Sequence, residues 1–380
     1  MTRIGPNESL VGRSGSRRAL QTPALVLDLD LLDANMERMR RLLAGRRTGL
    51  RPHTKTHKSV LIAKMQLEAG AVGVCCATVG EAEVLVEGGI GQVLVTSPAA
   101  TPAKCERLVR LSERAVDLMT VVDHRSHIEG LEAAAADKGA HLAVMVEIDL
   151  TRQRQGVSDP REAETLARLV QDNGHLSYRG LQGYAGQLQH IHDCDERLEA
   201  VRQTHERVAR FRDHLSSAGL APAVISGGGT GSIEFELAGE VLTDIQAGSY
   251  VFMDVQYSAL AHRADGAARF TNALFVATTV ISANAPGFAT TDAGYKSFAT
   301  DGPVPGIFSG APPGSTYRFF GDEHGQVVLP PGAPPLEIGE HLECVVPHCD
   351  PTVNLHDVYH CVRGDTLVDI WPVDARGRSC

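Results

Sequence analysis

The 380-residue sequence contains no run of about 18 or more apolar residues, so we expect no membrane-spanning helix. Its N-terminal segment also lacks an apolar stretch of signal-peptide length, and we expect no signal peptide. Positive charge is not in excess, because 36 lysines and arginines face 46 aspartates and glutamates, which gives a formal net charge of −10. This balance argues against nucleic acid or an anionic membrane as a partner, since both bind clustered lysine and arginine.

Paired cysteines are also missing, because none of the eight cysteines forms a Cys-x-x-Cys pattern. Cysteines this dilute in a long chain favour free thiols in a reducing cytoplasm over a disulfide framework, and a zinc finger or ribbon is not expected. The composition, 43% hydrophobic and 22% charged, is that of a globular protein with one or two cores. We therefore expect a cytoplasmic protein.

What the chain does contain is a regular alternation of short apolar runs and helical patterns, from residue 23 to about residue 255. Strands that are apolar on both faces and alternate with helices indicate a parallel sheet, here a (β/α)8 barrel. There is one strand too many for a barrel, so we expect the first to pair with the C-terminal region and the barrel to span residues 50–250. The nine runs begin at residues 23, 50, 72, 92, 116, 142, 180, 223 and 244, and helical patterns cover residues 32–43, 81–87, 103–114, 160–173 and 194–218.

The remaining third of the chain has a different sequence pattern. Strand-like runs at residues 273–282, 288–292, 341–347 and 366–372 are separated by turns rich in glycine and proline, without a long helical pattern. The sequence thus predicts two domains: a barrel domain at residues 23–255 and a mostly-β domain at residues 256–380, on which residues 1–22 pack.

Two lysines occur in the segment Arg51-Pro-His-Thr-Lys-Thr-His-Lys58, at the C-terminal end of the second predicted strand. Catalytic groups gather at that end of barrel strands. A partly desolvated lysine there can form a Schiff base with an aldehyde. Lys55 and Lys58 are both candidates, and both can instead be ordinary solvated lysines at the start of a helix.

A glycine-rich segment, Ser226-Gly-Gly-Gly-Thr-Gly-Ser232, ends the next-to-last barrel strand, and Gln246-Ala-Gly-Ser-Tyr250 ends the last one. Glycine allows the backbone to approach a ligand closely. Backbone N–H groups and the hydroxyls of the first segment can then surround a phosphate at a helix N-terminus. Barrels often hold a phosphate after strands seven and eight, so we predict a phosphate site here, with a flexible loop as the alternative.

A possible metal-binding pair lies in the second domain, where His348 and Asp350 are two residues apart. In an extended strand such residues share a face, so both side chains can reach one divalent ion. An imidazole and a carboxylate suit Mn²⁺, Mg²⁺ or Zn²⁺. The alternatives are hydrogen bonds to the backbone near a turn, or metal binding by the neighbouring His356 and Asp357.

Three further side chains follow barrel strands and are candidates for contacts in the site. Arg154 can reach a cofactor oxygen or form a surface salt bridge, and Arg152 beside it is an equally placed alternative. Tyr184 can hydrogen-bond a heterocycle or cap the barrel core. His190 has the ordinary pKa of a general base near neutral pH, and so does His192.

Together these segments resemble the D-threonine aldolase and D-serine dehydratase family, the fold-type-III pyridoxal-phosphate enzymes related to alanine racemase. The resemblance runs in order from residue 20 to residue 377 and includes segments not yet mentioned, among them Thr22-Pro-Ala-Leu-Val-Leu-Asp-Leu-Asp, Gly73-Val-Cys-Cys, Asp292-Ala-Gly and Asp322-Glu-His-Gly. It implies an N-terminal barrel that binds pyridoxal 5′-phosphate, a C-terminal β domain that carries the metal site, and a homodimer with its sites at the subunit interface.

The resemblance also implies roles for individual residues. Lys55 resembles the Schiff-base lysine, Arg154 the arginine near the cofactor's phenolic oxygen, and Tyr184 the tyrosine near its pyridine nitrogen. His190 resembles the catalytic base, and His348 and Asp350 the metal ligands. The residues that resemble the phosphate site are Ser226, Gly228, Gly229, Thr230, Gly231, Gly248, Ser249 and Tyr250.

The metal pattern separates two branches of the family. In the dehydratase branch, the resemblance implies a His-x-Cys pair that binds zinc. In the aldolase branch, it implies a His-x-Asp pair that binds manganese, magnesium or a similar ion such as cobalt or zinc. Asp350 therefore favours metal-assisted retro-aldol cleavage of β-hydroxy D-amino acids to glycine and an aldehyde. Dehydration to a 2-oxo acid and ammonia, or a non-catalytic cofactor carrier, are the alternatives. The chain departs from the aldolase pattern at Ala77 and Thr78, where Gln-Lys is common.

Overall fold

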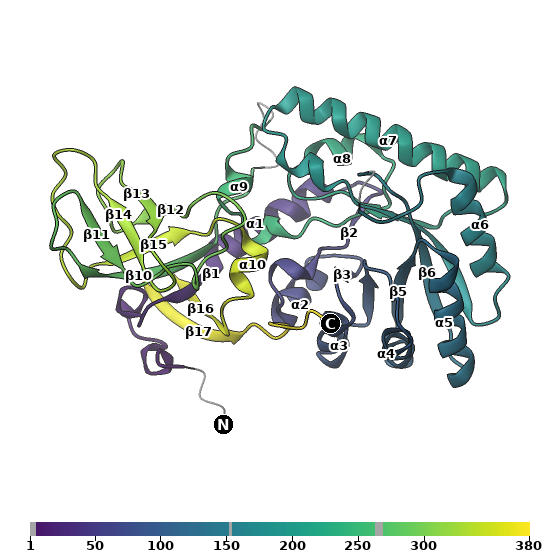
Figure 1. Cartoon of the computed structure of the whole chain (residues 1–380), viewed down its shortest axis with the longest axis horizontal. Helices are drawn as coiled ribbons and strands as arrows, with labels where there is room; N and C mark the ends of the chain where they lie inside the picture. Colours follow the sequence, from purple (N-terminus) through teal and green to yellow (C-terminus); the bar gives the residue numbers. More distant parts are fainter. Residues whose placement is uncertain (1–4, 152–153, 263–268) are drawn as a thin grey trace.

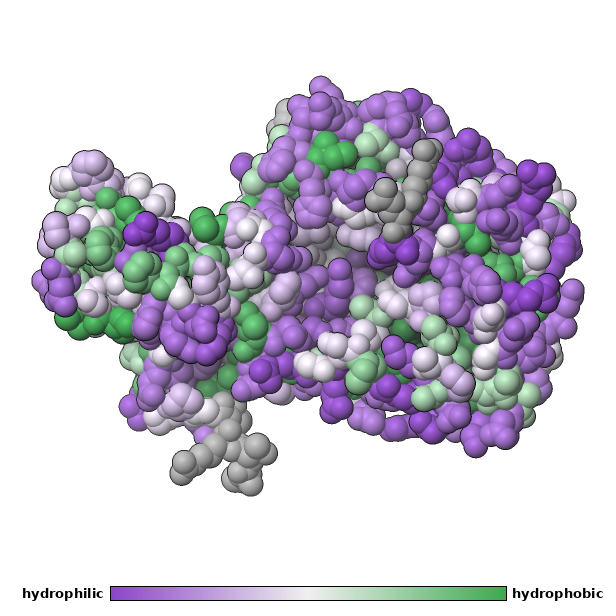
Figure 2. Space-filling view, in the orientation of Figure 1, coloured by the Kyte–Doolittle hydropathy of each residue, from purple (hydrophilic) through white to green (hydrophobic). Residues whose placement is uncertain are grey.

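The computed structural model describes residues 5–151, 154–262 and 269–380. The described chain forms two lobes, a larger one of strands and helices and a smaller one of strands (Figure 1). The face in Figure 2 is mostly hydrophilic, with apolar residues in scattered patches. Among the helices of these residues, none is long and apolar enough to cross a membrane.

The larger lobe contains an eight-stranded parallel sheet in the order β2-β9-β8-β7-β6-β5-β4-β3. The end strands meet through a parallel bridge between His53 and Cys75, and the Cys75 amide donates to the Pro52 carbonyl over 2.9 Å. The sheet therefore curls into the predicted barrel. Its strands are β2 (Gly49–Leu50), β3 (Val74–Cys76), β4 (Gln92–Val95), β5 (Asp117–Val122), β6 (Leu142–Glu147), β7 (Leu176–Gly183), β8 (Val224–Gly227) and β9 (Asp244–Ile245).

Most helices of this lobe begin at a polar capping residue in the segment that follows a strand. Thr78, Thr101 and Asp159, for example, accept backbone N–H groups at the starts of α3, α4 and α6. The larger-lobe helices are α1 (Leu29–Leu43), α2 (Val60–Glu68), α3 (Val79–Glu87), α4 (Pro102–Ser112), α5 (Arg125–Lys138), α6 (Pro160–Gln171), α7 (Cys194–Ser217), α8 (Ile233–Gly239) and α9 (Val255–Ser258), with short 3₁₀ turns η3 (Thr54–Thr56), η4 (Gly186–His190) and η5 (Ser249–Val251).

Alternate strand residues pack into two different clusters. Leu94 belongs to a small cluster with Met119 and Met145, whereas its neighbours Val93 and Val95 belong to the large hydrophobic core. This alternation is that of a barrel whose strands are apolar toward the interior and toward the helices. None of the eight cysteines, all of which lie in the described residues, forms a disulfide, as the sequence predicted.

The smaller lobe is a nine-stranded, mostly antiparallel sheet. Its member β1 (Ala24–Asp28) pairs antiparallel with β10 and parallel with β16, so the first strand leaves the barrel as expected. The remaining strands are β10 (Leu274–Ser282), β11 (Phe288–Thr291), β12 (Gly306–Ser309), β13 (Thr316–Phe319), β14 (Gly325–Val328), β15 (His341–Val345), β16 (Val358–Arg363) and β17 (Thr366–Pro372), and the N-terminal turns are η1 (Glu8–Leu10) and η2 (Ser16–Ala19).

The C-terminal tail leads from β17 back to the larger lobe, beside α2 and α3 (Figure 1). The Val60 amide donates to Asp374 over 2.8 Å, and the Ala375 amide donates to the Lys58 carbonyl over 2.9 Å. The predicted β-rich C-terminal region is therefore bonded directly to the barrel at the turn that follows Lys55.

Candidate active site

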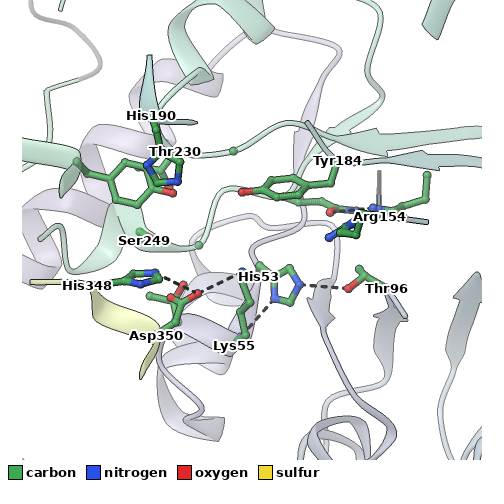
Figure 3. A pocket seen from close by; sticks show the side chains of 16 residues that line it. His53, Lys55, Thr96, Arg154, Tyr184, His190, Thr230, Ser249, His348 and Asp350 are labelled. Atoms are coloured by element: carbon green, nitrogen blue, oxygen red, sulfur yellow. Dashed lines mark hydrogen bonds and ion pairs between the residues drawn. The ribbon is translucent and has the colours of Figure 1, made fainter. Parts of the chain in front are cut away.

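A pocket lies where the C-terminal ends of the barrel strands face the smaller lobe (Figure 3). Residues from both lobes line it, which brings together segments more than 290 positions apart. Ten of the lining residues were predicted from the sequence: Lys55, Arg154, Tyr184, His190, Gly229, Thr230, Gly248, Ser249, His348 and Asp350. Six were not: His53, Thr56, Thr96, Gln182, Gln246 and Tyr257.

The two candidate lysines have different surroundings. Lys55 reaches into the pocket, where its Nζ lies 3.2 Å from Oδ2 of Asp350. Attraction to Asp350 raises the pKa of Lys55, and this effect outweighs partial burial. Lys58 instead forms a buried ion pair with Glu81. The structure thus leaves Lys55 as the lysine available to a ligand in the pocket.

His348 and Asp350 lie on the same wall, but not in the predicted strand. Residues Cys349–Val353 form a short helix, α10, and His348 is the extended residue that precedes it. The expectation of an extended strand was wrong. Pro351 lies in the first turn of the helix, where backbone N–H groups have no partner within the helix, so the N–H group that proline lacks is not missed there. The turn still directs both side chains to the pocket, with Nε2 of His348 4.0 Å from Oδ2 of Asp350.

The surroundings of this pair fit a metal ion. Oδ1 of Asp350 is buried and has no hydrogen-bond partner. Nδ1 of His348 lies 2.8 Å from Oδ2 of Asp301, an arrangement that leaves Nε2 free to bind a metal. No group of three or more histidine, cysteine or acidic side chains within the described residues forms a complete metal site. The pair therefore resembles an open site with positions left for water or substrate.

Asp350 is ionised despite its environment. Burial opposes the charge, but attraction to Lys55 and His348 outweighs burial and lowers the pKa of Asp350. The competing pair is placed elsewhere: Nε2 of His356 lies 3.0 Å from the Ser297 carbonyl, and Asp357 pairs with Arg376 at 2.9 Å. Neither residue lines the pocket.

Arg154 and Tyr184 form the opposite side of the pocket. The guanidinium carbon of Arg154 lies 5.5 Å from the centre of the Tyr184 ring, a cation–π contact. Nη2 of Arg154 also lies 3.3 Å from Glu147, whose carboxyl group is buried below it. Burial raises the pKa of Glu147 to about 8, although Gln155 and Arg154 oppose this effect. Arg152, the alternative to Arg154, lies outside the described residues.

His190 reaches the pocket at the end of η4, where its ring stacks on Tyr257 with centroids 6.4 Å apart and an interplanar angle of 30°. Partial burial lowers the pKa of His190, and the neighbouring His348 and His192 add to this effect. Its imidazole is therefore neutral at neutral pH and can accept a proton. His192 does not line the pocket; its Nδ1 lies 3.3 Å from the Ala259 carbonyl.

The predicted phosphate residues divide into two groups. Gly229, Thr230, Gly248 and Ser249 line the pocket, and the Thr230 hydroxyl is buried without a hydrogen-bond partner. A Cβ atom on Gly248 would lie 2.6 Å from the His53 carbonyl, so only glycine lets this turn approach the lysine segment so closely. The unpartnered hydroxyl and the small residues around it fit a phosphate group.

The other four predicted residues, Ser226, Gly228, Gly231 and Tyr250, are not among the pocket lining. The Ser226 hydroxyl donates to Asp244, the Gly231 amide donates to Gln189 over 2.8 Å, and the Tyr250 hydroxyl accepts from Gln66 over 3.1 Å. These groups hold the glycine-rich turn and the end of the barrel in place. Their direct contact with a phosphate stays a prediction.

His53 was missed although it lies two residues before Lys55. Its Nδ1 accepts the Lys55 amide over 3.4 Å, and its Nε2 lies 3.3 Å from the Thr96 hydroxyl. Burial lowers the pKa of His53 well below its ordinary value, and Lys55 adds to the effect. This neutral ring holds the turn that carries Lys55. Asp301 and Tyr257 had no sequence signal, since only the fold brings them to the site.

The departure at Ala77 and Thr78 lies outside the pocket lining. Thr78 caps α3 and donates to the Arg378 carbonyl over 2.6 Å, and the Ala77 amide donates to Glu81 over 2.8 Å. In this chain the two positions therefore support α3 and the C-terminal tail.

Comparisons with known proteins agree with this geometry. The family model for the alanine racemase N-terminal domain matches residues 27–256, and the model "Putative serine dehydratase domain" matches residues 273–362. A D-threonine aldolase from Arthrobacter sp is 40% identical over 95% of this chain and 94% of its own length. A 3-hydroxy-D-aspartate aldolase from Paracoccus denitrificans (strain Pd 1222) is 38% identical over 95% of this chain and 93% of its own.

A solved structure of an aldolase is also similar to this chain. D-threonine aldolase from Filomicrobium marinum superposes with a TM-score of 0.90 at 37% identity, covering 96% of this chain and 97% of that one. A D-threo-3-hydroxyaspartate dehydratase from Delftia sp. (strain HT23) is more distant, at 30% identity over 93% of this chain and 97% of its own. The chain therefore belongs to the D-threonine aldolase and 3-hydroxy-D-aspartate aldolase family of alanine racemase-like, fold-type-III pyridoxal-phosphate enzymes.

Proposed function

We propose that this protein cleaves β-hydroxy D-amino acids such as D-threonine, D-phenylserine or 3-hydroxy-D-aspartate into glycine and an aldehyde. The observation that carries the proposal is the convergence on one pocket of the Lys55 amine, the His348–Asp350 pair and the His190 imidazole. The higher identity to aldolases than to the dehydratase supports carbon–carbon cleavage over loss of the hydroxyl group.

Lys55 would hold pyridoxal phosphate through Nζ, and Arg154 and Tyr184 would flank its ring. The hydroxyls of Thr230 and Ser249, beside Gly229 and Gly248, would bind its phosphate. Bound there, the cofactor supplies an acceptor for the electron pair of the broken Cα–Cβ bond. The buried Glu147 keeps Arg154 at the ring side of the pocket.

His348 and Asp350 would hold a divalent ion. Mn²⁺ or Mg²⁺ suits this donor pair, and Zn²⁺ or Co²⁺ is also compatible with it. Bound there, the ion supplies Lewis-acid polarisation that lowers the pKa of the substrate's β-hydroxyl. Asp301 directs Nε2 of His348 to the site by holding its Nδ1.

His190 would accept the proton of the β-hydroxyl group, since its lowered pKa keeps the imidazole neutral. As the Cα–Cβ bond breaks, the β-oxygen becomes the aldehyde oxygen and Cα takes up one proton. Glycine and the aldehyde then contain all the atoms of the substrate. Tyr257 keeps the His190 ring in place through its stacking contact.

The experiment that tests this proposal incubates the purified holoenzyme with D-threonine and with L-threonine, in Mn²⁺ and in EDTA, and quantifies acetaldehyde. We expect acetaldehyde from the D-substrate only, and its loss in EDTA with recovery on adding Mn²⁺. Equal rates in EDTA and in Mn²⁺ would contradict the metal assignment, and acetaldehyde from L-threonine would contradict the stereochemistry.

We also propose the division of labour between the domains, with residues 23–255 binding the cofactor and residues 256–380 supplying the metal ligands, and a cytoplasmic homodimer as the working form. The lack of disulfides among the described cysteines supports the compartment. A subunit contact on the smaller lobe would cover exposed apolar side chains such as Phe308, Phe320 and Ile338. Sedimentation analysis would distinguish a dimer from a monomer.

A further inference from the structure

Asp254 occupies the junction between the two lobes, directly after the last barrel segment. Its side chain is fully buried, with 0% of its surface exposed. Oδ1 accepts the Tyr257 amide over 2.9 Å, and Oδ2 accepts the Cys349 amide over 3.0 Å. One carboxylate therefore binds the first turns of two helices, α9 from the barrel and α10 from the smaller lobe.

The two amides belong to two different segments that line the site. Tyr257 stacks on His190, the proposed proton acceptor. Cys349 stands between His348 and Asp350, the proposed metal ligands. A shift of the Asp254 carboxylate would thus move the proton acceptor and the metal-binding turn relative to each other.

Neighbouring contacts fix the carboxylate itself. The Val255 amide donates to the Val346 carbonyl over 3.0 Å, and the Cys349 thiol lies 3.4 Å from the Met253 carbonyl. Met253 has a φ of 49°, a left-handed conformation that is costly for a residue other than glycine. Met253 directly precedes Asp254, so its conformation sets the direction in which the Asp254 side chain reaches its two partners.

We propose that Asp254 is a positioning residue that sets the distance between the His190–Tyr257 pair and the metal-binding turn at His348 and Asp350. This inference rests on the proposed function, because it assumes a metal ion on that turn. Within the described residues, no other side chain is recorded as accepting a hydrogen bond from the Cys349 N–H group.

Substitutions of Asp254 can separate its hydrogen bond to the Tyr257 amide from its hydrogen bond to the Cys349 amide. In Asp254→Asn only one side-chain atom accepts a hydrogen bond, and the amide nitrogen would face the N–H group of the other helix. Asp254→Ser keeps a good N-cap for α9 but has no second oxygen for Cys349. Asp28→Asn is a matched control, since Asp28 is also buried and caps α1 by accepting the amides of Asp30 and Leu31, away from the pocket.

The test measures Mn²⁺ binding to each cofactor-loaded variant by calorimetry, well below its melting temperature, and then kcat at saturating Mn²⁺. We expect the Kd for Mn²⁺ to rise by about tenfold or more in both Asp254 variants, as is typical when a residue behind a metal ligand is lost, and kcat to fall as well. Asp28→Asn should lower the melting temperature without changing either constant.

Wild-type Kd and kcat in Asp254→Ser, the variant that keeps the α9 cap, would overturn the inference and leave the proposed function standing. If the wild-type protein bound no Mn²⁺, or if His348→Ala bound it equally well, the metal assignment and the inference would both be overturned.

Discussion

At the scale of single residues, two lysines three positions apart have entirely different surroundings. The sequence narrows the choice to Lys55 and Lys58, because both follow a barrel strand. The resemblance to the family favours Lys55, and the tertiary structure gives the physical reason, since Glu81, which forms an ion pair with Lys58, comes from α3. The same holds for His190 and His192, which differ in their neighbours and not in any local pattern.

Replacing Lys55 by alanine should abolish activity while the protein stays folded, because its side chain is 41% exposed and supports no core packing. We expect a loss of about 1000-fold or more, as for other residues that act covalently. Borohydride reduction followed by mass spectrometry provides the measurement: a reduced phosphopyridoxyl group should be added to the wild-type and control chains and not to Lys55→Ala. Lys64→Ala, on the exposed side of α2, is the control, and cofactor fixed to the Lys55 variant would contradict the assignment.

Replacing His190 by glutamine should lower kcat by about 100-fold to 10,000-fold, the usual contribution of a general base. His192→Gln should keep wild-type kcat, because His192 does not line the pocket. Steady-state kinetics across pH provides the check. The wild-type rate should fall as the pH drops below the ordinary histidine range, since His190 has a lowered pKa and then becomes protonated. An unchanged acid limb in His190→Gln would contradict its role.

At the scale of elements, strands and most helices follow from periodicity and capping residues. The helix predicted at residues 160–173 is observed as α6, whose buried Ala163, Leu166, Ala167 and Val170 form one stripe. The error at residues 349–353 has a different cause. Five residues are too few to show a helical period, and the pattern His-x-Asp fits one face of a strand as well as one turn of helix.

Gly180 shows where a strand depends on a single glycine. Its φ is 142°, and a Cβ atom would lie 1.9 Å from the Val224 carbonyl oxygen, within the pairing of β7 with β8. Gly180→Ala should therefore destabilise the protein by about 2 kcal/mol or more, as expected for strain that the backbone cannot relieve. Chemical denaturation provides the free energy of unfolding. Gly174→Ala is the control, because nothing lies within 4 Å of its added Cβ and its φ is ordinary.

Glu147, at the end of β6, makes stability depend on pH. Its pKa is about 8 in the folded protein against 4.5 as the ordinary value, so the folded state holds the extra proton between these limits. Stability should thus be highest below that window and fall as the pH rises through about 8. Melting temperatures of the cofactor-free protein from acid to alkaline pH should decline less in Glu147→Gln. An identical decline in both proteins would show that another group is responsible.

At the scale of the whole molecule, the sequence predicts the barrel, the β domain and the exit of the first strand. The resemblance to a family adds most of the site, and ten predicted residues do line one pocket. Besides His53, it misses residues that lie far along the chain from the groups they contact. Asp301 stands 47 positions before His348 in a turn without regular pattern, and Asp254 bridges segments 95 positions apart.

The arrangement of the lobes also explains why the site needs both. The barrel contributes the lysine, the arginine, the tyrosine and the turns that we propose to bind the phosphate, whereas the smaller lobe contributes His348 and Asp350. Neither lobe alone contains the contact between Lys55 and Asp350. The chemistry that we propose therefore depends on the junction between them.

The most direct test of the proposed activity is the balance of products formed from D-threonine by the purified, Mn²⁺-loaded enzyme. Retro-aldol cleavage predicts one glycine and one acetaldehyde for each D-threonine consumed, with no ammonia. Formation of 2-oxobutanoate and ammonia in equal amounts would contradict this account and assign the protein to the dehydratases.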